Sequence, residues 1–111
     1  MDQSTRADIA AQGWHIHGIV EEAYRRHPAI RTDPPSADWL EKQRLLLADM
    51  AIHLLQTSLR PGDIALDQLR NNLHAILTIS HGFLPEAGLK EATGRLTQSS
   101  SQASRDEPGR R

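Results

Sequence analysis

Residues 38–59 read DWLEKQRLLLADMAIHLLQTSL, and this stretch decides the fold. At about 100° per residue, its apolar side chains fall on two separate faces of one helix. The first leucine face carries Trp39, Leu40, Leu46, Leu47, Met50 and Leu54. The second leucine face carries Leu45, Ile52, Leu55 and Leu59. Between them runs a polar strip of Lys42, Asp49, His53 and Gln56, which we expect to face water. Because both apolar faces must be covered, the segment is predicted to be the middle of a bundle or half of a subunit interface.

A long helix is predicted before this stretch. It starts at Ser4 or Thr5, either of which can cap it, and ends at His27, where a proline stops it. Its isoleucine face is formed by Ile9, Ile16, Ile19, Val20, Ala23 and Tyr24. A proline-rich connector, residues 28–35, then crosses the surface to Ser36, the predicted cap of the next helix. The order of these signals indicates two antiparallel helices.

Two further helices are predicted after the central stretch. The third runs from Ile64 to about His81, with Asp63 as its cap and Gly82 in a left-handed conformation at its end. Its apolar stripe is Leu66, Leu69, Leu73, Ile76 and Leu77. The fourth, residues 86–96, is short and contains two glycines, each of which costs about 1 kcal/mol relative to alanine.

These elements predict an all-α protein, a bundle of three long antiparallel helices plus a short fourth helix. The bundle domain is expected to span residues 1–97. From Gln98 onward the chain lacks large apolar side chains, so residues 98–111 are predicted to be a disordered polar tail. With only four aromatic residues the core should be aliphatic and of marginal size, which favours help from a partner.

Composition excludes several classes of protein. A formal net charge of −1 offers no long-range attraction for nucleic acid or anionic lipid. The absence of cysteine removes disulfides and thiol chemistry and fits a reducing compartment. No run approaches the roughly 20 apolar residues of a membrane span, and the N-terminus lacks the pattern of a signal peptide. We expect a cytoplasmic protein without membrane contact, and a bacterial one from its richness in Arg, Ala and Leu.

Catalytic and metal-binding motifs are weak. The serines lack the Gly-x-Ser-x-Gly setting of a nucleophile, and the glycines form no phosphate-binding loop. Six histidines invite a test for a metal, but the Glu-x-x-His spacing of helical metal sites does not occur. Asp49 and His53 lie four apart and are expected to form a hydrogen-bonded surface pair. The sequence therefore predicts no enzyme, no cofactor and no metal site.

A short segment resembles histidine phosphotransfer domains, which are helical bundles with one solvent-facing histidine. His74 is followed by an apolar residue two places on, Ile76, and by another nine places on, Phe83. The resemblance implies that His74 accepts a phosphoryl group. The chain departs from the pattern at Leu77 and Thr78, where those domains typically carry lysine and glycine. This function is kept as an alternative.

A helical DNA-binding regulator is the second alternative. The turn at residues 60–63 followed by an amphipathic helix has the order of parts of a helix-turn-helix. The exposed face of that helix carries one arginine against Asp63 and Asp67, so it would repel phosphates as much as attract them. No nucleic-acid partner is expected.

Two features favour a protein partner. Trp14 lies opposite the isoleucine face, beside the notch left by Gly18, where it is suited to anchor another chain. The second leucine face, Leu45, Ile52, Leu55 and Leu59, has too little of this chain left to cover it. Arg25 would lie at the polar rim. We therefore expect a small non-catalytic interaction or regulatory module, such as an adaptor, chaperone, inhibitor or assembly factor, with a homodimer as one form.

Overall fold

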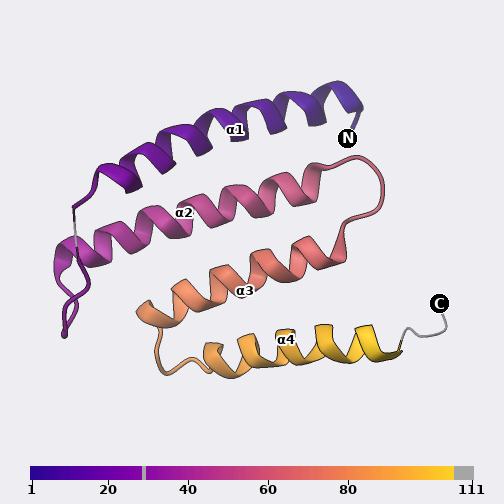
Figure 1. Cartoon of the computed structure of the whole chain (residues 1–111). Coiled ribbons are helices and arrows are strands. Elements are labelled where there is room, and N and C mark those ends of the chain that lie inside the picture. Colours follow the sequence, from indigo (N-terminus) through magenta and orange to yellow (C-terminus); the bar gives the residue numbers. More distant parts are fainter. Residues whose placement is uncertain (29, 107–111) are drawn as a thin grey trace. The chain divides into compact units, whose positions relative to one another are not determined.

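A computed structural model describes residues 1–28 and 30–106, with side chains described to residue 97. The described chain is all-helical (Figure 1). Its helices are α1 (Gln3–Arg26), α2 (Ala37–Leu59), α3 (Leu66–Phe83) and α4 (Leu89–Asp106). The all-α class is confirmed, while the bundle of three long antiparallel helices stays a prediction. Residues 98–106 of the predicted tail lie within α4, which is therefore longer than the predicted short helix 86–96, and residues 107–111 of the tail lie outside the described residues.

The chain divides into two compact units, Met1–Ile64 and Ala65–Arg111. In the first, α1 packs on α2. The guanidinium of Arg6 donates to the carbonyl of Leu59 at 3.1 Å, so the start of α1 meets the end of α2. At the opposite end, Lys42 Nζ donates to the carbonyl of His27 at 3.0 Å. The two helices are therefore antiparallel, as the connector predicted. We call this pair the α1–α2 hairpin.

Side chains next to the helix ends explain where α1 and α2 begin. Asp2 caps α1, because its carboxylate accepts the backbone N–H of Thr5 at 2.7 Å. The predicted caps Ser4 and Thr5 lie inside the helix, so that prediction is wrong by a few residues. Ser36 caps α2 as predicted, accepting the backbone N–H of Trp39 at 3.0 Å. Each cap satisfies an N–H that has no partner within its helix.

The polar strip of α2 turns toward α1, and the prediction that it faces water is wrong. Asp49 and Gln56 are buried, with 8% and 7% of their surface exposed. Gln56 Nε2 donates to the carbonyl of Ala10 at 2.9 Å, and Lys42 reaches the end of α1. Polar side chains can line a helix contact when each finds a partner across it, and here backbone carbonyls of α1 serve as acceptors. The hairpin is thus joined by polar contacts.

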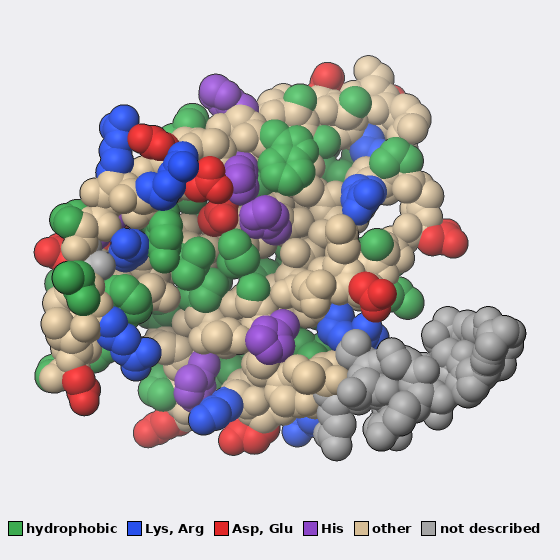
Figure 2. All heavy atoms as spheres, viewed as in Figure 1, with side chains coloured by type: hydrophobic (Ala, Val, Ile, Leu, Met, Phe, Trp, Pro, Cys, Tyr) green, Lys and Arg blue, Asp and Glu red, His purple; other side chains and the backbone are tan. Residues whose placement is uncertain are grey.

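Part of the isoleucine face of α1 is turned away from α2, although Tyr24 of the same face lies against Lys42 of α2. Ile16 is 50% exposed and Ile19 is 59% exposed, whereas Gly13, on the side that meets α2, is buried. At about 100° per residue, Ile16 and Ile19 lie well round the helix from the positions that touch α2. Ile16 and Ile19 therefore lie at the surface of the hairpin. Hydrophobic side chains lie at the surface in Figure 2, among histidine and charged side chains.

In the second unit α3 packs on α4. α3 starts at Leu66 after Ala65, which makes no side-chain cap, so the predicted role of Asp63 is wrong. Gly82 lies inside α3 and is not a left-handed cap. The left-handed conformation occurs instead at Gly88, with φ +75°, directly before α4. This conformation favours glycine, which has no Cβ to clash with the backbone. α4 begins directly after it at Leu89, later than the predicted start at residue 86.

Very little apolar surface is fully buried. Among the side chains described in residues 1–28 and 30–97, Leu59 is the one buried large hydrophobic residue, and no side chain is completely enclosed. Phe83 and Leu84, at the end of α3, are 37% and 56% exposed. In the described part of the chain no helix is both long and apolar enough to cross a membrane.

Candidate functional site

Two histidines and an aspartate meet in the α1–α2 hairpin. Asp49 and His53 are four residues apart on α2, so their side chains project from one face of that helix. His17 faces them from α1. His17 Nε2 lies 3.1 Å from Asp49 Oδ1, and His53 Nε2 lies 3.6 Å from Asp49 Oδ2. One ligand atom from each of the three residues falls within 4.8 Å of the other two. We call this group the His–Asp–His cluster.

The aspartate of the cluster is buried but incompletely bonded. Asp49 is 8% exposed, which corrects the expectation of a surface pair with His53. Its Oδ1 atom is buried and has no hydrogen-bond partner, although His17 Nε2 lies only 3.1 Å away. His17 Nε2 therefore lies at contact distance from the carboxylate without completing a hydrogen bond to Oδ1. A buried carboxylate oxygen in this state lacks the compensation that burial normally requires.

An indole covers one side of the cluster. The ring of Trp14 lies edge-on to both imidazoles, with centroid distances of 5.3 Å to His17 and 6.1 Å to His53. The two imidazoles are themselves edge-on, 4.9 Å apart. Edge-on packing of aromatic rings is attractive and fixes their orientation. Trp14 thus holds both histidines in place while half of its own surface, 50%, stays exposed.

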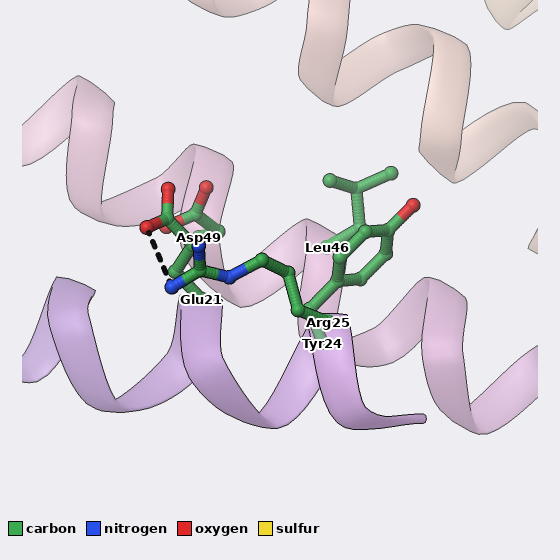
Figure 3. Close-up of a pocket in the computed structure, with 5 residues that line it drawn as sticks. All are labelled: Glu21, Tyr24, Arg25, Leu46 and Asp49. Carbon is green, nitrogen blue, oxygen red and sulfur yellow. Dashed lines mark ion pairs between the residues drawn. The ribbon is translucent and has the colours of Figure 1, made fainter. Parts of the chain in front are cut away.

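A shallow pocket of about 270 Å³ adjoins the cluster at Asp49 (Figure 3). Its walls are Glu21, Tyr24 and Arg25 from α1, with Leu46 and Asp49 from α2. Arg25 forms an ion pair with Glu21 at 3.6 Å, which Figure 3 marks. The pocket is therefore polar on its α1 side, and Asp49 belongs both to it and to the cluster.

Two imidazole nitrogens and a carboxylate are ligands that transition-metal ions prefer. Zinc sites commonly combine His nitrogens with an Asp or Glu oxygen, and three protein ligands leave a position for water or another group. The same residues can alternatively act as a hydrogen-bonded pair in which the carboxylate orients an imidazole. The unpartnered Oδ1 of Asp49 favours a ligand role over a completed hydrogen-bond network.

The residues predicted to bind a partner are spread over the hairpin. Trp14 packs on the cluster, and Gly18 is exposed, with open space where a Cβ would lie. Arg25 is exposed and forms ion pairs with Glu21 and Glu22, as a solvated helix end would. In the second leucine face, Leu55 is 37% exposed and Leu59 is 8% exposed. Leu45 and Ile52, from the same face, are half-buried.

The alternative site residue, His74, lies exposed on α3. Its backbone carbonyl accepts the hydroxyl of Thr78 at 2.7 Å. The solvent exposure predicted for its imidazole is thus present, although exposure is ordinary for a histidine on a helix surface.

Two of the three residues of the cluster are recognisable from the sequence. The spacing of Asp49 and His53 revealed one face of α2, but His17 lies more than thirty positions earlier in the chain. His15 and His17 are two residues apart, a spacing that points their side chains to different sides of α1 and gives no sign of a shared site. The signal that links His17 to Asp49 is the antiparallel pairing of the helices, in which each step along α1 corresponds to one step back along α2.

Comparisons with known proteins add no assignment. Neither protein-family models, nor curated proteins, nor solved structures give a match to this chain.

Proposed function

We propose that this chain, a bundle of antiparallel helices, is a small non-catalytic interaction module that binds protein through apolar helix faces. The first candidate partner is a second copy of the chain, in a cytoplasmic, bacterial setting. One observation carries the proposal. The polar strip of α2 faces α1, whereas Ile16 and Ile19 of α1 stay 50% and 59% exposed. Large apolar residues left on a helix face are typical of protein-binding surfaces.

One side of the hairpin carries most of this apolar surface. Counting round each helix from the contact pair His17 and Asp49, Ile16 on α1 and the second leucine face on α2 lie on the same side. A contact supports that alignment, because a Cβ at Gly13 would lie 3.3 Å from Leu55 Cδ2. Leu55 is 37% exposed there. We call this surface the apolar side of the hairpin.

The small core gives a thermodynamic reason for a partner. Burial of apolar area supplies about 25 cal/mol per Å², and it must offset the conformational entropy lost by every ordered residue. In the described part of the chain Leu59 is the one large apolar side chain that is buried, and Ile16, Ile19 and Leu55 are 50%, 59% and 37% exposed. A second copy that covers Ile16, Ile19 and Leu55 would bury area that one copy leaves exposed.

Charged residues at the end of α1 suit the rim of such an interface. Arg25 and Arg26 are held by Glu22 at 3.0 Å and 2.8 Å and remain exposed. Exposed ion pairs of this kind contribute little to affinity but influence which partner is accepted.

Sedimentation velocity of the full chain over a wide concentration range tests the proposal. We expect a monomer–dimer equilibrium that shifts toward dimer as concentration rises. A chain that sediments as a monomer even at the highest concentration would remove self-association from the proposal.

The phosphotransfer alternative predicts that the chain accepts a phosphoryl group, whereas a binding module does not. A phosphodonor such as acetyl phosphate should leave the chain unlabelled if it is a binding module. Labelling detected by intact mass, and lost in His74→Gln, would favour the phosphotransfer alternative. The exposed position of His74 makes this a fair test, because the imidazole is accessible to the donor.

A further inference from the structure

We propose that the His–Asp–His cluster is a binding site for one transition-metal ion, Zn²⁺ in the first instance. The ligands are an imidazole nitrogen of His17, a carboxylate oxygen of Asp49 and an imidazole nitrogen of His53. This site is separate from the apolar surface invoked above, so either proposal can fail without the other.

The three side chains lie close enough together to bind one shared metal ion. Around a tetrahedral zinc with bonds of about 2.0–2.1 Å, neighbouring ligand atoms lie roughly 3.3 Å apart. His17 Nε2 lies 3.1 Å from Oδ1 of Asp49, and His53 Nε2 lies 3.6 Å from its other oxygen, Oδ2, so each imidazole is near that separation from one carboxylate oxygen. One ligand atom from each of the three residues lies within 4.8 Å of the other two, so the three side chains must draw closer together around a bound ion.

The buried carboxylate supplies independent support. Asp49 is 8% exposed, and its Oδ1 atom has no hydrogen-bond partner. A completed Asp–His hydrogen bond would be the simplest use of a buried aspartate, yet the His17 contact at 3.1 Å does not have hydrogen-bond geometry. A cation among these atoms would satisfy the carboxylate oxygen and both facing nitrogens together.

The chemistry of the ligands selects the class of ion. Imidazole is a ligand for zinc, copper, nickel and iron, whereas Mg²⁺ and Ca²⁺ prefer oxygen donors. With two nitrogens and one oxygen, the cluster should take Zn²⁺ or Co²⁺ and reject Mg²⁺ and Ca²⁺. Bound metal would join α1 to α2, since His17 comes from one helix and the other two ligands from its partner.

Calorimetric titration of the full chain with Zn²⁺ provides the first test. We expect one ion per chain, with no competition from a large excess of Mg²⁺. Asp49→Asn and His17→Gln keep the approximate shape of each side chain and remove a ligand. Because even supporting residues around metal ligands are worth about 10–100-fold in affinity, each variant should weaken binding at least tenfold.

Matched controls separate the cluster from surface histidines. His15→Gln changes an exposed histidine two residues from His17, and His74→Gln changes an exposed histidine on α3. Both should bind Zn²⁺ like the unaltered chain. Circular dichroism of every variant establishes that its helices are intact, and a ligand variant that has lost helicity is replaced by His53→Gln, whose side chain is more exposed.

The fluorescence of Trp14 provides a second readout, which reports whether the metal ion binds at the cluster. Its indole lies 5.3 Å and 6.1 Å from the two imidazoles, so a paramagnetic ion such as Co²⁺ at the cluster should quench its fluorescence. The variant Trp39→Phe removes the other indole and leaves Trp14 as the reporter. Thermal unfolding should also shift upward with added Zn²⁺, because an ion that binds only the folded chain stabilises it.

The proposal is overturned if Zn²⁺ does not bind, or if binding and Trp14 quenching persist unchanged in Asp49→Asn and His17→Gln. Affinity lost equally in His15→Gln would overturn it as well, because that result assigns binding to exposed histidines. Loss confined to the ligand variants, together with quenching of Trp14, supports it.

Discussion

The side-chain amide of Gln56 lies directly over the Cα of Gly13, where any Cβ would overlap its nitrogen. From there Gln56 donates to the carbonyl of Ala10 at 2.9 Å. The absence of a side chain at position 13 lets α2 place a polar group against the backbone of α1. This contact lies near the centre of the hairpin and makes the polar contact surface possible.

Replacing Gly13 with alanine should therefore lower the stability of the chain, although helix propensity alone favours alanine. Gly13→Ala gains about 1 kcal/mol from propensity, but it displaces the Gln56 amide and leaves a buried polar group unsatisfied, at about 1–3 kcal/mol. We expect a net loss of about 1 kcal/mol in urea unfolding. Gly18→Ala is the matched control, since nothing lies within 4 Å of its Cβ position, and it should stabilise the chain by roughly 0.5–1 kcal/mol. Equal stabilisation by both changes would contradict the contact.

Lys42 should contribute to stability through two contacts at the end of α1. Its Nζ donates to the carbonyl of His27 at 3.0 Å and lies 4.7 Å from the centre of the Tyr24 ring. A cation near a helix C-terminus and over an aromatic ring is favourable on both counts. Lys42→Met should lower the free energy of unfolding by about 1 kcal/mol. Lys90→Met, at an exposed site on α4, is the control and should change it by less than about 0.5 kcal/mol.

The start of α1 should weaken in acid. The backbone N–H of Thr5 donates to Asp2 and lowers the pKa of that carboxyl below its ordinary value of 3.8. A group with a lowered folded pKa contributes stability that is present above its unfolded pKa and is lost as pH falls through the folded pKa. Amide exchange in the first turn of α1 should therefore speed up below about pH 4 relative to the helix centre. In Asp2→Asn, which caps without ionising, this local pH dependence should disappear.

Ile19 should matter for association and little for folding. The side chain is 59% exposed, so Ile19→Ser should change the free energy of unfolding of the monomer by less than about 0.5 kcal/mol. Burial of an isoleucine at an interface is worth about 1.5–3 kcal/mol, so the dimer should dissociate more than about tenfold more readily. Ile30→Ser alters an isoleucine that is 79% exposed in the connector and serves as the control. Sedimentation equilibrium measures both; equal weakening by the two changes would place the interface elsewhere.

The sequence determined where α1, α2 and α3 form, whereas α4 begins and ends later than predicted. Apolar periodicity located α2 to within a residue, and Ser36 marked its start because a serine there can accept the Trp39 N–H. The proline-rich connector predicted that α2 turns back along α1. These features depend on local sequence, so they can be recognised without knowing the rest of the fold.

Only the tertiary structure decided which helix faces meet. Periodicity defines the polar strip and the two leucine faces of α2, but it does not say which one a neighbour covers. Hydrophobicity favoured an apolar contact with α1; the structure instead uses Gly13, Gln56 and Lys42, because backbone carbonyls of α1 provide partners that the sequence does not display. The His–Asp–His cluster follows from the same antiparallel pairing, which brings His17 to Asp49. Local sequence patterns determine which side chains lie on each face of a helix. Residues distant in the chain determine which of those faces another helix contacts.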